Sequence, residues 1–465
     1  MLDRPFRRNS AGIAAAIADL TAAFGNRVVT SLAVREQHAN TTTWVAGEPP
    51  DAVVYPQSAD DVQQIVRICA SHRAPVIAFG TGTSFEGHVN APYGGISVDL
   101  KDMNRIIAVH PQDFDCVVEP GVTRKQLNDH LRDQGLFFPV DPGADASLGG
   151  MCSTRASGTT AVRYGTMKDN VLALKVVRPD GEVMTTSRRA RKSSAGYDLT
   201  RLIVGAEGTL GIISELTLKL HGIPEAIASA VCRFPSIRTA CDAAITAIQS
   251  GIPIARVELL DEVQVKVCNA HSKLGLAEEP TLFLEFHGTQ AGVAEQSDRF
   301  GDIARELGAA DFDWSARPED RTRLWQARHD VFWALRSYRA GAKVVVTDVC
   351  VPISRLAECV TETKRDAEAS GITAPIVGHV GDGNFHASVL VMMEDPAEVA
   401  AAKAFIDRVA ERALAMEGTC TGEHGIGEGK RHLLEPEHGA VAVDAMRAIK
   451  RALDPDNIMN PGKIV

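Results

Sequence analysis

Two histidines in the last quarter of the chain have the spacing of a metal-binding pair. His379 and His386 flank Gly381-Asp-Gly-Asn384, a stretch typical of a tight turn between two strands. If the arms pair around this turn, Val380 faces Phe385 and His379 faces His386. Directly opposed residues share one face, with Cβ atoms about 4.5–5.5 Å apart. The spacing therefore predicts two imidazoles able to chelate one metal ion; the alternative is a pair of surface or hydrogen-bonded histidines.

A second motif offers a third ligand and an acid–base group. Glu423 and His424 stand between Gly422 and Gly425, and glycine lets the backbone come close to a substrate. The motif does not match the known zinc-protease patterns, because Cys420 stands where the inverted form requires a histidine. From spacing alone, a solvated loop remains an alternative to a functional pair.

Three glycine-rich segments, 80–87, 141–150 and 205–211, have the composition of nucleotide-binding loops. Gly80-x-Gly82 follows the apolar run Val76–Phe79, but Phe85 stands where a Rossmann motif has its third glycine. Glycine lets backbone N–H groups approach a ligand closely, which suits a pyrophosphate. Several such loops favour an extended dinucleotide over the alternative of three ordinary turns.

Short strands and helices alternate from about Pro56 to Leu220 and predict the element order that carries these loops. Ser58 is a natural N-cap for a helix whose apolar residues fall on one face, and Pro179-Asp-Gly181 predicts a hairpin turn. Beyond His221-Gly-Ile-Pro224, longer helical patterns are interleaved with strands. That pattern predicts an α+β second domain.

Composition limits the classes of partner. The 465 residues carry a net charge of -10, which argues against nucleic acid or an anionic membrane as the main partner. The nine cysteines are scattered without a Cys-x-x-Cys pair, which indicates reduced thiols.

The N-terminal region and the hydropathy of the chain give an expectation about location. Arg4, Arg7 and Arg8 precede an Ala-rich stretch without a long apolar run, which makes a poor signal peptide. No run approaches the roughly 20 apolar residues of a transmembrane helix. We expect a cytoplasmic protein, at most peripheral to a membrane, in preference to a mitochondrial one.

The motifs of the first half, taken in order, resemble the FAD domain of the vanillyl-alcohol oxidase/p-cresol methylhydroxylase family. They are Pro75–Ser84, Glu119-Pro-Gly-Val122, Asp141-Pro-Gly143, Leu148-Gly-Gly150, Ser157-Gly158, Arg163-Tyr-Gly165 and Gly205–Gly211. The resemblance covers nearly all of the chain after about residue 45. It implies an α+β fold, with a two-subdomain FAD-binding domain and an α+β cap domain that contains an antiparallel sheet.

The resemblance also implies how FAD is held. Gly80 to Ser84 would wrap the pyrophosphate, and Thr83 stands where members with covalent flavin have a histidine, so non-covalent FAD is expected. The implied cofactor-binding residues are Phe79, Gly80, Thr81, Gly82, Thr83, Ser84, Gly87, Pro142, Gly143, Ser147, Leu148, Gly149, Gly150, Ser153, Ser157, Gly158, Glu207, Gly208, Gly211, Ile213 and Asn460.

Motifs of the second half resemble the D-lactate dehydrogenase (cytochrome) branch of this family, which includes relatives that oxidise glycolate or D-2-hydroxyglutarate. They are Thr347–Pro352, Gly378–His386, Cys420–Gly427 and Met459–Lys463. By this resemblance His379, His386 and Glu423 bind a divalent metal, Zn or Mn. His424 is the catalytic base, and Asn460 lies near the flavin ring.

The substrate carboxylate needs a fixed cation. Leu324–Arg328 resembles the segment that carries the carboxylate-binding arginine, so Arg328 is the candidate, and Lys343 is a weaker second one. Phe332 and Val346 stand where D-2-hydroxyglutarate dehydrogenases have polar partners, which favours a short, apolar substrate side chain.

From these observations we expect a domain order of four parts. They are an N-terminal helical segment (1–45), an FAD-binding domain (46–222), a cap or substrate domain with the metal site (223–425) and a C-terminal segment that packs back on the FAD domain (426–465).

The expected activity is FAD-dependent, metal-assisted dehydrogenation of a small D-2-hydroxy acid, with D-lactate favoured. Electrons would pass to cytochrome c, a quinone or an electron-transfer protein, and a homodimer is an expected assembly. The alternatives are a glycolate or D-2-hydroxyglutarate dehydrogenase, a flavin-free metal-dependent hydrolase and a non-catalytic FAD subunit.

Overall fold

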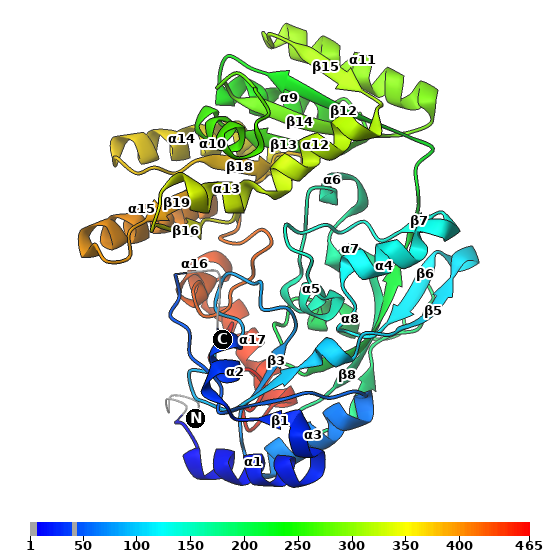
Figure 1. The fold of residues 1–465 in the computed structure, drawn as a ribbon, viewed down its shortest axis with the longest axis vertical. Coiled ribbons are helices and arrows are strands. Elements are labelled where there is room, and N and C mark those ends of the chain that lie inside the picture. Colours follow the sequence, from blue (N-terminus) through cyan, green and yellow to red (C-terminus); the bar gives the residue numbers. More distant parts are fainter. Residues whose placement is uncertain (1–6, 40–43) are drawn as a thin grey trace. The chain divides into compact units, whose positions relative to one another are not determined.

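A computed structural model describes residues 7–39 and 44–465 of the chain (Figure 1). Arg4 lies outside the described residues. The chain forms two compact units: a first unit of Met1–Ala156, Thr166–Gly222 and Glu423–Val465, and a second unit of Ser157–Gly165 and Ile223–Gly422. Among the described residues, no helix combines the length and the apolar character needed to cross a bilayer.

The first unit begins with a four-stranded sheet in the order β1-β2-β4-β3. Its strands are Val28–Val29, Ala52–Val54, Ile96–Asp99 and Val76–Phe79 for β1, β2, β4 and β3, and β2, β4 and β3 run parallel. Helices α1 (Ser10–Phe24) and α3 (Ala59–Ser71) bury their apolar faces in the same core as these strands. The predicted cap is confirmed, because the Ser58 side chain accepts from the Asp61 N–H.

The first unit also contains a five-stranded antiparallel sheet, in the order β5-β6-β10-β8-β9, and a two-stranded sheet of β7 (Leu136–Phe137) and β11 (His221–Gly222). The strands of the five-stranded sheet are β5 (Ile106–His110), β6 (Asp115–Val118), β10 (Ile212–Lys219), β8 (Val171–Val177) and β9 (Val183–Thr185). The predicted hairpin around Pro179-Asp-Gly181 joins β8 to β9. Helices α4 (Arg124–Leu131) and α5 (Leu148–Thr154) supply Leu127, Leu131, Leu148 and Met151 to the core under this sheet.

The second unit is built on an eight-stranded sheet in the order β15-β12-β14-β13-β18-β19-β16, with β17 paired to β19, and every pairing is antiparallel. The strands are β12 (Ala226–Arg233), β13 (Ile254–Leu260), β14 (Thr281–Gly288), β15 (Phe312–Ser315), β16 (Lys343–Val346), β17 (Val349–Cys350), β18 (Ile376–His379) and β19 (Asn384–Val391). The helices of this unit are α6 (Ala161–Tyr164), α9 (Ile237–Gln249), α10 (Glu262–Ser272), α11 (Gln290–Glu306), α12 (Pro318–His329), α13 (Val331–Tyr338), α14 (Leu356–Ala369) and α15 (Pro396–Ala415) (Figure 1).

The β18–β19 hairpin has a different register from the predicted one. His386 lies opposite Val377, not opposite His379, so the turn comprises residues 380–383. The predicted pairing is therefore wrong by two residues, because β19 begins at Asn384, which the prediction placed in the turn. Side chains alternate with a period of two, so a shift of two leaves both histidines on one face as diagonal neighbours.

Residues 157–165 group with the second unit, although the expected domain division places them in the FAD-binding domain. Tyr164 donates to or accepts from the His287 Nδ1 atom at 2.7 Å, and Arg163 donates to the Pro253 carbonyl. Both contacts lie within the second unit. The second unit therefore includes a short segment, Ser157–Gly165, that lies in the sequence between two parts of the first unit.

Candidate functional site

The two histidines of the hairpin lie side by side on the sheet of the second unit. The ring centroids of His379 and His386 are 5.5 Å apart, with an interplanar angle of 87°. Both residues are buried, at 7% and 5% exposure. The predicted pair is thus brought together by a diagonal contact between β18 and β19.

Each histidine has a partner at its Nδ1 atom. His379 Nδ1 lies 2.6 Å from Glu258 Oε1, and His386 Nδ1 lies 3.0 Å from the Thr347 carbonyl. When Nδ1 donates to an oxygen, the lone pair resides on Nε2, and this is the arrangement of metal-binding histidines. The donor set of the hairpin therefore fits a divalent ion that accepts imidazole ligands.

Asp348 organises the segment next to His386. Its carboxylate accepts from Asn384 Nδ2 at 2.9 Å and from the Thr421 hydroxyl at 2.8 Å, and it lies 3.7 Å from His386 Nδ1. The Thr421 contact fixes the chain two residues before Glu423. The backbone at Glu423 is therefore at most roughly 7 Å along the chain from Thr421.

The predicted carboxylate clamp has a buried anionic partner. Arg328, on α12, donates through Nε at 2.8 Å to Glu258 Oε2, and its Nη2 atom is ion-paired with the same oxygen at 2.6 Å. Burial favours a raised pKa for Glu258, but electrostatic attraction to His379 and Arg328 and the hydrogen bonds from both outweigh it, so the pKa of this carboxyl is lowered. Glu258 is thus an anion that contacts both a predicted metal ligand and the predicted clamp.

The other residues predicted around the substrate have different surroundings. Lys343 is exposed at the start of the edge strand β16. Phe332 and Val346 pack against an apolar cluster that includes Leu324 and Trp325. The two positions that are polar in D-2-hydroxyglutarate dehydrogenases therefore belong to an apolar environment here.

Two of the predicted nucleotide loops meet in the first unit. A Cβ atom on Gly80 would lie 2.3 Å from Ser147 Oγ, so the loop after β3 passes close to the start of α5. Ser147 Oγ is buried and has no hydrogen-bond partner in the part of the chain that the structure describes. A buried hydroxyl without a partner beside a glycine loop fits a ligand with hydrogen-bonding groups, as FAD has.

The remaining predicted FAD residues fall into two groups. In the first unit, Pro142 and Gly143 precede α5, Gly149, Gly150 and Ser153 lie on it, Gly208 and Gly211 precede β10, and Ile213 lies on that strand. The Ser153 carbonyl accepts from the Glu207 N–H at 2.8 Å, which joins α5 to the 205–211 segment. Ser157 and Gly158, in contrast, belong to the second unit.

Glu207, one of the predicted cofactor-binding residues, is bonded through its side chain to the segment after His424. Its carboxylate accepts from the backbone N–H groups of Ile426 at 2.7 Å and Gly427 at 2.8 Å, and lies 3.3 Å from His88 Nε2. A Cβ atom on Gly425 would lie 2.6 Å from the same carboxylate. Glu207 therefore anchors the segment that directly follows His424.

His424 itself packs on the first glycine loop. Its ring centroid lies 4.7 Å from that of Phe85, with an interplanar angle of 48°. Phe85 is the residue that breaks the Rossmann pattern, and it follows Ser84 directly. The predicted base is thus held against the loop predicted to wrap the pyrophosphate.

The C-terminal tail returns to this same region of the first unit. Asn460 donates through Nδ2 to the carbonyls of His88 at 3.0 Å and Glu207 at 2.7 Å, and its backbone N–H donates to the Val76 carbonyl. Asn460 Oδ1 is buried without a hydrogen-bond partner in the described chain. The predicted flavin neighbour therefore lies where β3, the 205–211 segment and the tail meet, with an acceptor still to be satisfied.

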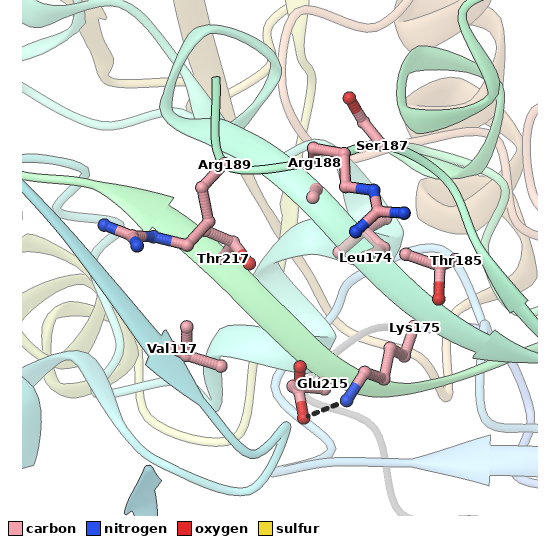
Figure 2. Close-up of a pocket in the computed structure, with 10 residues that line it drawn as sticks. Val117, Leu174, Lys175, Thr185, Ser187, Arg188, Arg189, Glu215 and Thr217 are labelled. Carbon is pink, nitrogen blue, oxygen red and sulfur yellow. Dashed lines mark hydrogen bonds and ion pairs between the residues drawn. The ribbon is translucent and has the colours of Figure 1, made fainter. Parts of the chain in front are cut away.

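A separate hollow of about 360 Å³ lies on the five-stranded sheet (Figure 2). Lys175 Nζ lies 2.9 Å from Glu215 Oε2 on the neighbouring strand, and Figure 2 shows this pair together with Arg188 and Arg189 on the segment after β9. Arg189 is also bonded to Asp115. The hollow shares no residue with the predicted site residues, so we do not assign it to the cofactor or the substrate.

Sequence reasoning missed Glu258, Asp348, Phe85 and His88. Glu258 had a signal, because a glutamate inside the apolar strand pattern Ile254–Leu260 needs a buried cationic partner. Asp348 lies inside a motif that carried the family resemblance, but no role followed from its sequence neighbours. His88 had no local signal.

Two protein families and several solved structures match this chain. The family of FAD linked oxidases, C-terminal domain, matches residues 223–464, and the FAD binding domain family matches residues 50–187. The crystal structure of p-cresol methylhydroxylase with substrate bound covers 98% of this chain and 97% of its own with a TM-score of 0.80 and 20% identity. The predicted fold class is confirmed: an FAD-binding domain of this type with a second domain on an antiparallel sheet.

Two curated relatives cover most of the chain. The probable D-lactate dehydrogenase, mitochondrial, of Danio rerio is 50% identical over 99% of this chain and 94% of its own length. The D-lactate dehydrogenase [cytochrome], mitochondrial, of Arabidopsis thaliana is 47% identical over 90% of this chain and 73% of its own length. The chain belongs to the FAD-linked oxidase family and is an FAD-dependent oxidoreductase.

These findings contradict two of the expectations from the sequence. The names of both relatives place them in mitochondria, which contradicts the predicted cytoplasmic location. The alternative of a flavin-free hydrolase is also wrong, because the chain contains an FAD-binding domain. The N-terminal composition that suggested the location is a weak signal, since short basic, Ala-rich segments occur in ordinary helices as well as in targeting segments.

Proposed function

We propose that this chain is a D-lactate dehydrogenase that uses FAD and one divalent metal ion, Zn or Mn, and passes electrons to a cytochrome. The observation that carries the proposal is the pairing of His379 with His386 on one sheet face, each with an oxygen partner at Nδ1. The names of the relatives supply the substrate and the acceptor class.

In the proposed metal site, His379 and His386 are ligands and Glu423 is the third. The two imidazoles have the tautomer that leaves Nε2 for a metal, because their Nδ1 atoms have oxygen partners. The link from Asp348 to Thr421 holds the chain two residues before Glu423, and a carboxylate suits the same ions.

When bound, FAD supplies the hydride acceptor and the metal ion supplies positive charge beside the substrate hydroxyl. Arg328 holds the substrate carboxylate with its forked donors. The His424 imidazole takes the proton of the 2-hydroxyl, while its contact with Phe85 orients the ring. Asn460 lies near the flavin and contributes a buried acceptor.

The substrate side chain is proposed to be small and apolar. Phe332 and Val346 pack in an apolar cluster, so a second carboxylate on the substrate would have no fixed cation at these positions. This favours D-lactate over D-2-hydroxyglutarate. Glycolate remains the alternative substrate, because it lacks only the methyl group.

An anaerobic substrate panel tests the proposal. Purified holoenzyme is mixed with D-lactate, L-lactate, glycolate or D-2-hydroxyglutarate, and the visible flavin absorbance is followed. Fast bleaching with D-lactate and slow bleaching with the others is expected. Bleaching by another acid at a higher kcat/KM than by D-lactate would reassign the substrate, and no bleaching by any of them would end the proposal.

A further inference from the structure

One buried carboxylate, that of Glu258, contacts both a proposed metal ligand and the proposed carboxylate-binding arginine. Glu258 is fully buried in the middle of the eight-stranded sheet. Its Oε1 atom lies 2.6 Å from His379 Nδ1, and its Oε2 atom accepts from Arg328 Nε at 2.8 Å and is ion-paired with Nη2 at 2.6 Å. Both partners are residues with proposed roles, the first as a metal ligand and the second as the carboxylate clamp.

The register of the strands explains why this contact forms. Glu258 on β13 is the direct cross-strand partner of His379 on β18, so both side chains point to the same face. Helix α12 brings Arg328 to that face. A buried carboxylate is costly without paired hydrogen bonds, and here each oxygen has a cationic or N–H partner.

The second unit contains a similar cluster one strand away. Glu285 on β14 is bonded to His287 Nε2 at 2.6 Å and to Arg321 Nε at 2.7 Å, and Arg321 lies on the same helix as Arg328. The His287 Nδ1 atom is bonded to the Tyr164 hydroxyl at 2.7 Å. Both ring nitrogens of His287 thus have protein partners, so this cluster has no imidazole nitrogen for a metal.

We propose that Glu258 is a positioning residue that sets the tautomer of His379 and the orientation of Arg328 together. The proposal rests on the proposed function of these two residues. An acceptor at His379 Nδ1 keeps the proton there and the lone pair on Nε2. The Nε hydrogen bond and the Nη2 ion pair hold one edge of the guanidinium and leave the donors on Nη1 for a substrate carboxylate.

The substitution Glu258→Gln separates this role from simple packing. The amide has the same shape, but its single oxygen can accept from only one of the two partners, its NH₂ group then faces the donor of the other, and the negative charge that opposes Arg328 is lost. Glu258→Asp keeps the charge with a shorter reach. Glu285→Gln is the matched control, because it removes the charge of an equally buried Arg–Glu–His cluster outside the proposed site.

The experiment measures metal affinity by chelator competition, KM and kcat for D-lactate, FAD content and Tm in the holoenzymes. We expect Glu258→Gln to bind metal about 10–100-fold more weakly and to raise KM by about tenfold or more with FAD retained, because loss of an outer-shell partner has effects of this size. Glu258→Asp should be intermediate. Glu285→Gln should lower Tm while metal affinity and KM change by less than about twofold.

Four results separate the outcomes. Parental metal affinity and KM in Glu258→Gln would overturn the proposal, as would equal losses in Glu258→Gln and Glu285→Gln, which indicate a structural role for both. If Glu258→Gln does not fold, the same comparison between Glu258→Asp and Glu285→Gln decides. If the parental protein itself binds no metal or is not reduced by D-lactate, the proposed function fails, and the role of Glu258 fails with it.

Discussion

The imidazole of His424 rests against the phenyl ring of Phe85, with ring centroids 4.7 Å apart. His424 belongs to the motif that follows the cap region, whereas Phe85 directly follows the first glycine loop. The contact therefore joins the proposed base to the loop expected to hold the FAD pyrophosphate. Aromatic pairs of this kind contribute about 0.5–1.5 kcal/mol beyond their buried area.

Replacing His424 with alanine should slow flavin reduction by D-lactate at least about 100-fold, because general-base catalysis contributes about 10²–10⁴-fold. FAD content should stay at the parental level, since no other contact of the glycine loops changes. Anaerobic stopped-flow absorbance measures the rate. Reduction at the parental rate would remove His424 from the mechanism.

Phe85→Leu should slow flavin reduction by about 3–10-fold, the factor that corresponds to roughly 1 kcal/mol of lost ring orientation. KM should change less than kcat, because Phe85 is not expected to bind the substrate. Phe312→Leu, which alters an aromatic pair in the second unit, is the control. Identical rate losses in both variants would indicate a general effect on folding.

The two candidate cations should differ in their effect on KM. Arg328→Lys keeps the charge but loses the forked donors that contact Glu258, so KM for D-lactate should rise by about tenfold. Lys343→Ala should change KM by less than about twofold, because an exposed side chain on an edge strand is strongly solvated. Steady-state kinetics with a dye acceptor measures both. A larger KM change in Lys343→Ala than in Arg328→Lys would exchange their roles.

The C-terminal tail should depend on one buried ion pair. Lys450 Nζ donates to the carbonyls of Thr209 at 2.7 Å and Met459 at 2.8 Å and is paired with Asp454 at 2.5 Å. Burial lowers the pKa of Lys450, although Asp454 opposes the shift. Lys450→Met leaves Asp454 buried without its partner, so the free energy of unfolding should fall by about 3–5 kcal/mol.

Denaturant unfolding of the holoenzyme checks this value, with Lys266→Met, an exposed position on α10, as the control. A loss below about 1 kcal/mol in Lys450→Met would mean that the pair does not hold the tail.

Stability at low pH should reveal the contact between α14 and α15. The pKa of Asp366 is lowered from 3.8 to about 2, mainly because Arg408 donates hydrogen bonds to it, with Arg412 adding to the effect. A lowered folded-state pKa gives stability that is fully present above the unfolded value of 3.8 and is lost as the pH falls towards about 2. Asp366→Asn should therefore lower Tm near neutral pH, and the difference from the parent should shrink below about pH 4.

Thermal unfolding at a series of pH values measures the difference, and Asp302→Asn, which removes an exposed pair with Arg305, is the matched control. A Tm difference for Asp366→Asn that is constant from neutral pH to about pH 3 would contradict the assignment.

Local patterns in the sequence predicted much of the framework. The Ser58 cap, the Val76–Phe79 strand and the hairpin at Pro179-Asp-Gly181 depend on neighbours within a few residues, and the structure contains each of them. The hairpin register was wrong because the glycine-rich turn allows two pairings that both bury the same face. Only the surrounding strands, β13 and β16, decide between them.

The parts of the site that sequence did not predict depend on long-range contacts. Glu258 is separated from Arg328 by 70 residues and from His379 by 121 residues. Glu207 contacts Gly427 across 220 residues. Local spacing carries no information about such contacts, so the sequence predicted neither a role for Glu258 nor the contact of Glu207 with the loop after His424.

The metal content of the FAD-loaded protein tests the central claim most directly. Elemental analysis after gel filtration should find one zinc or manganese ion per chain in the parent. In the double variant His379→Ala/His386→Ala the bound metal should fall to near zero while FAD content is retained, because the two imidazoles are proposed metal ligands. Equal metal content in the parent and the double variant, or a metal-free parent that oxidises D-lactate at full rate, would contradict the account.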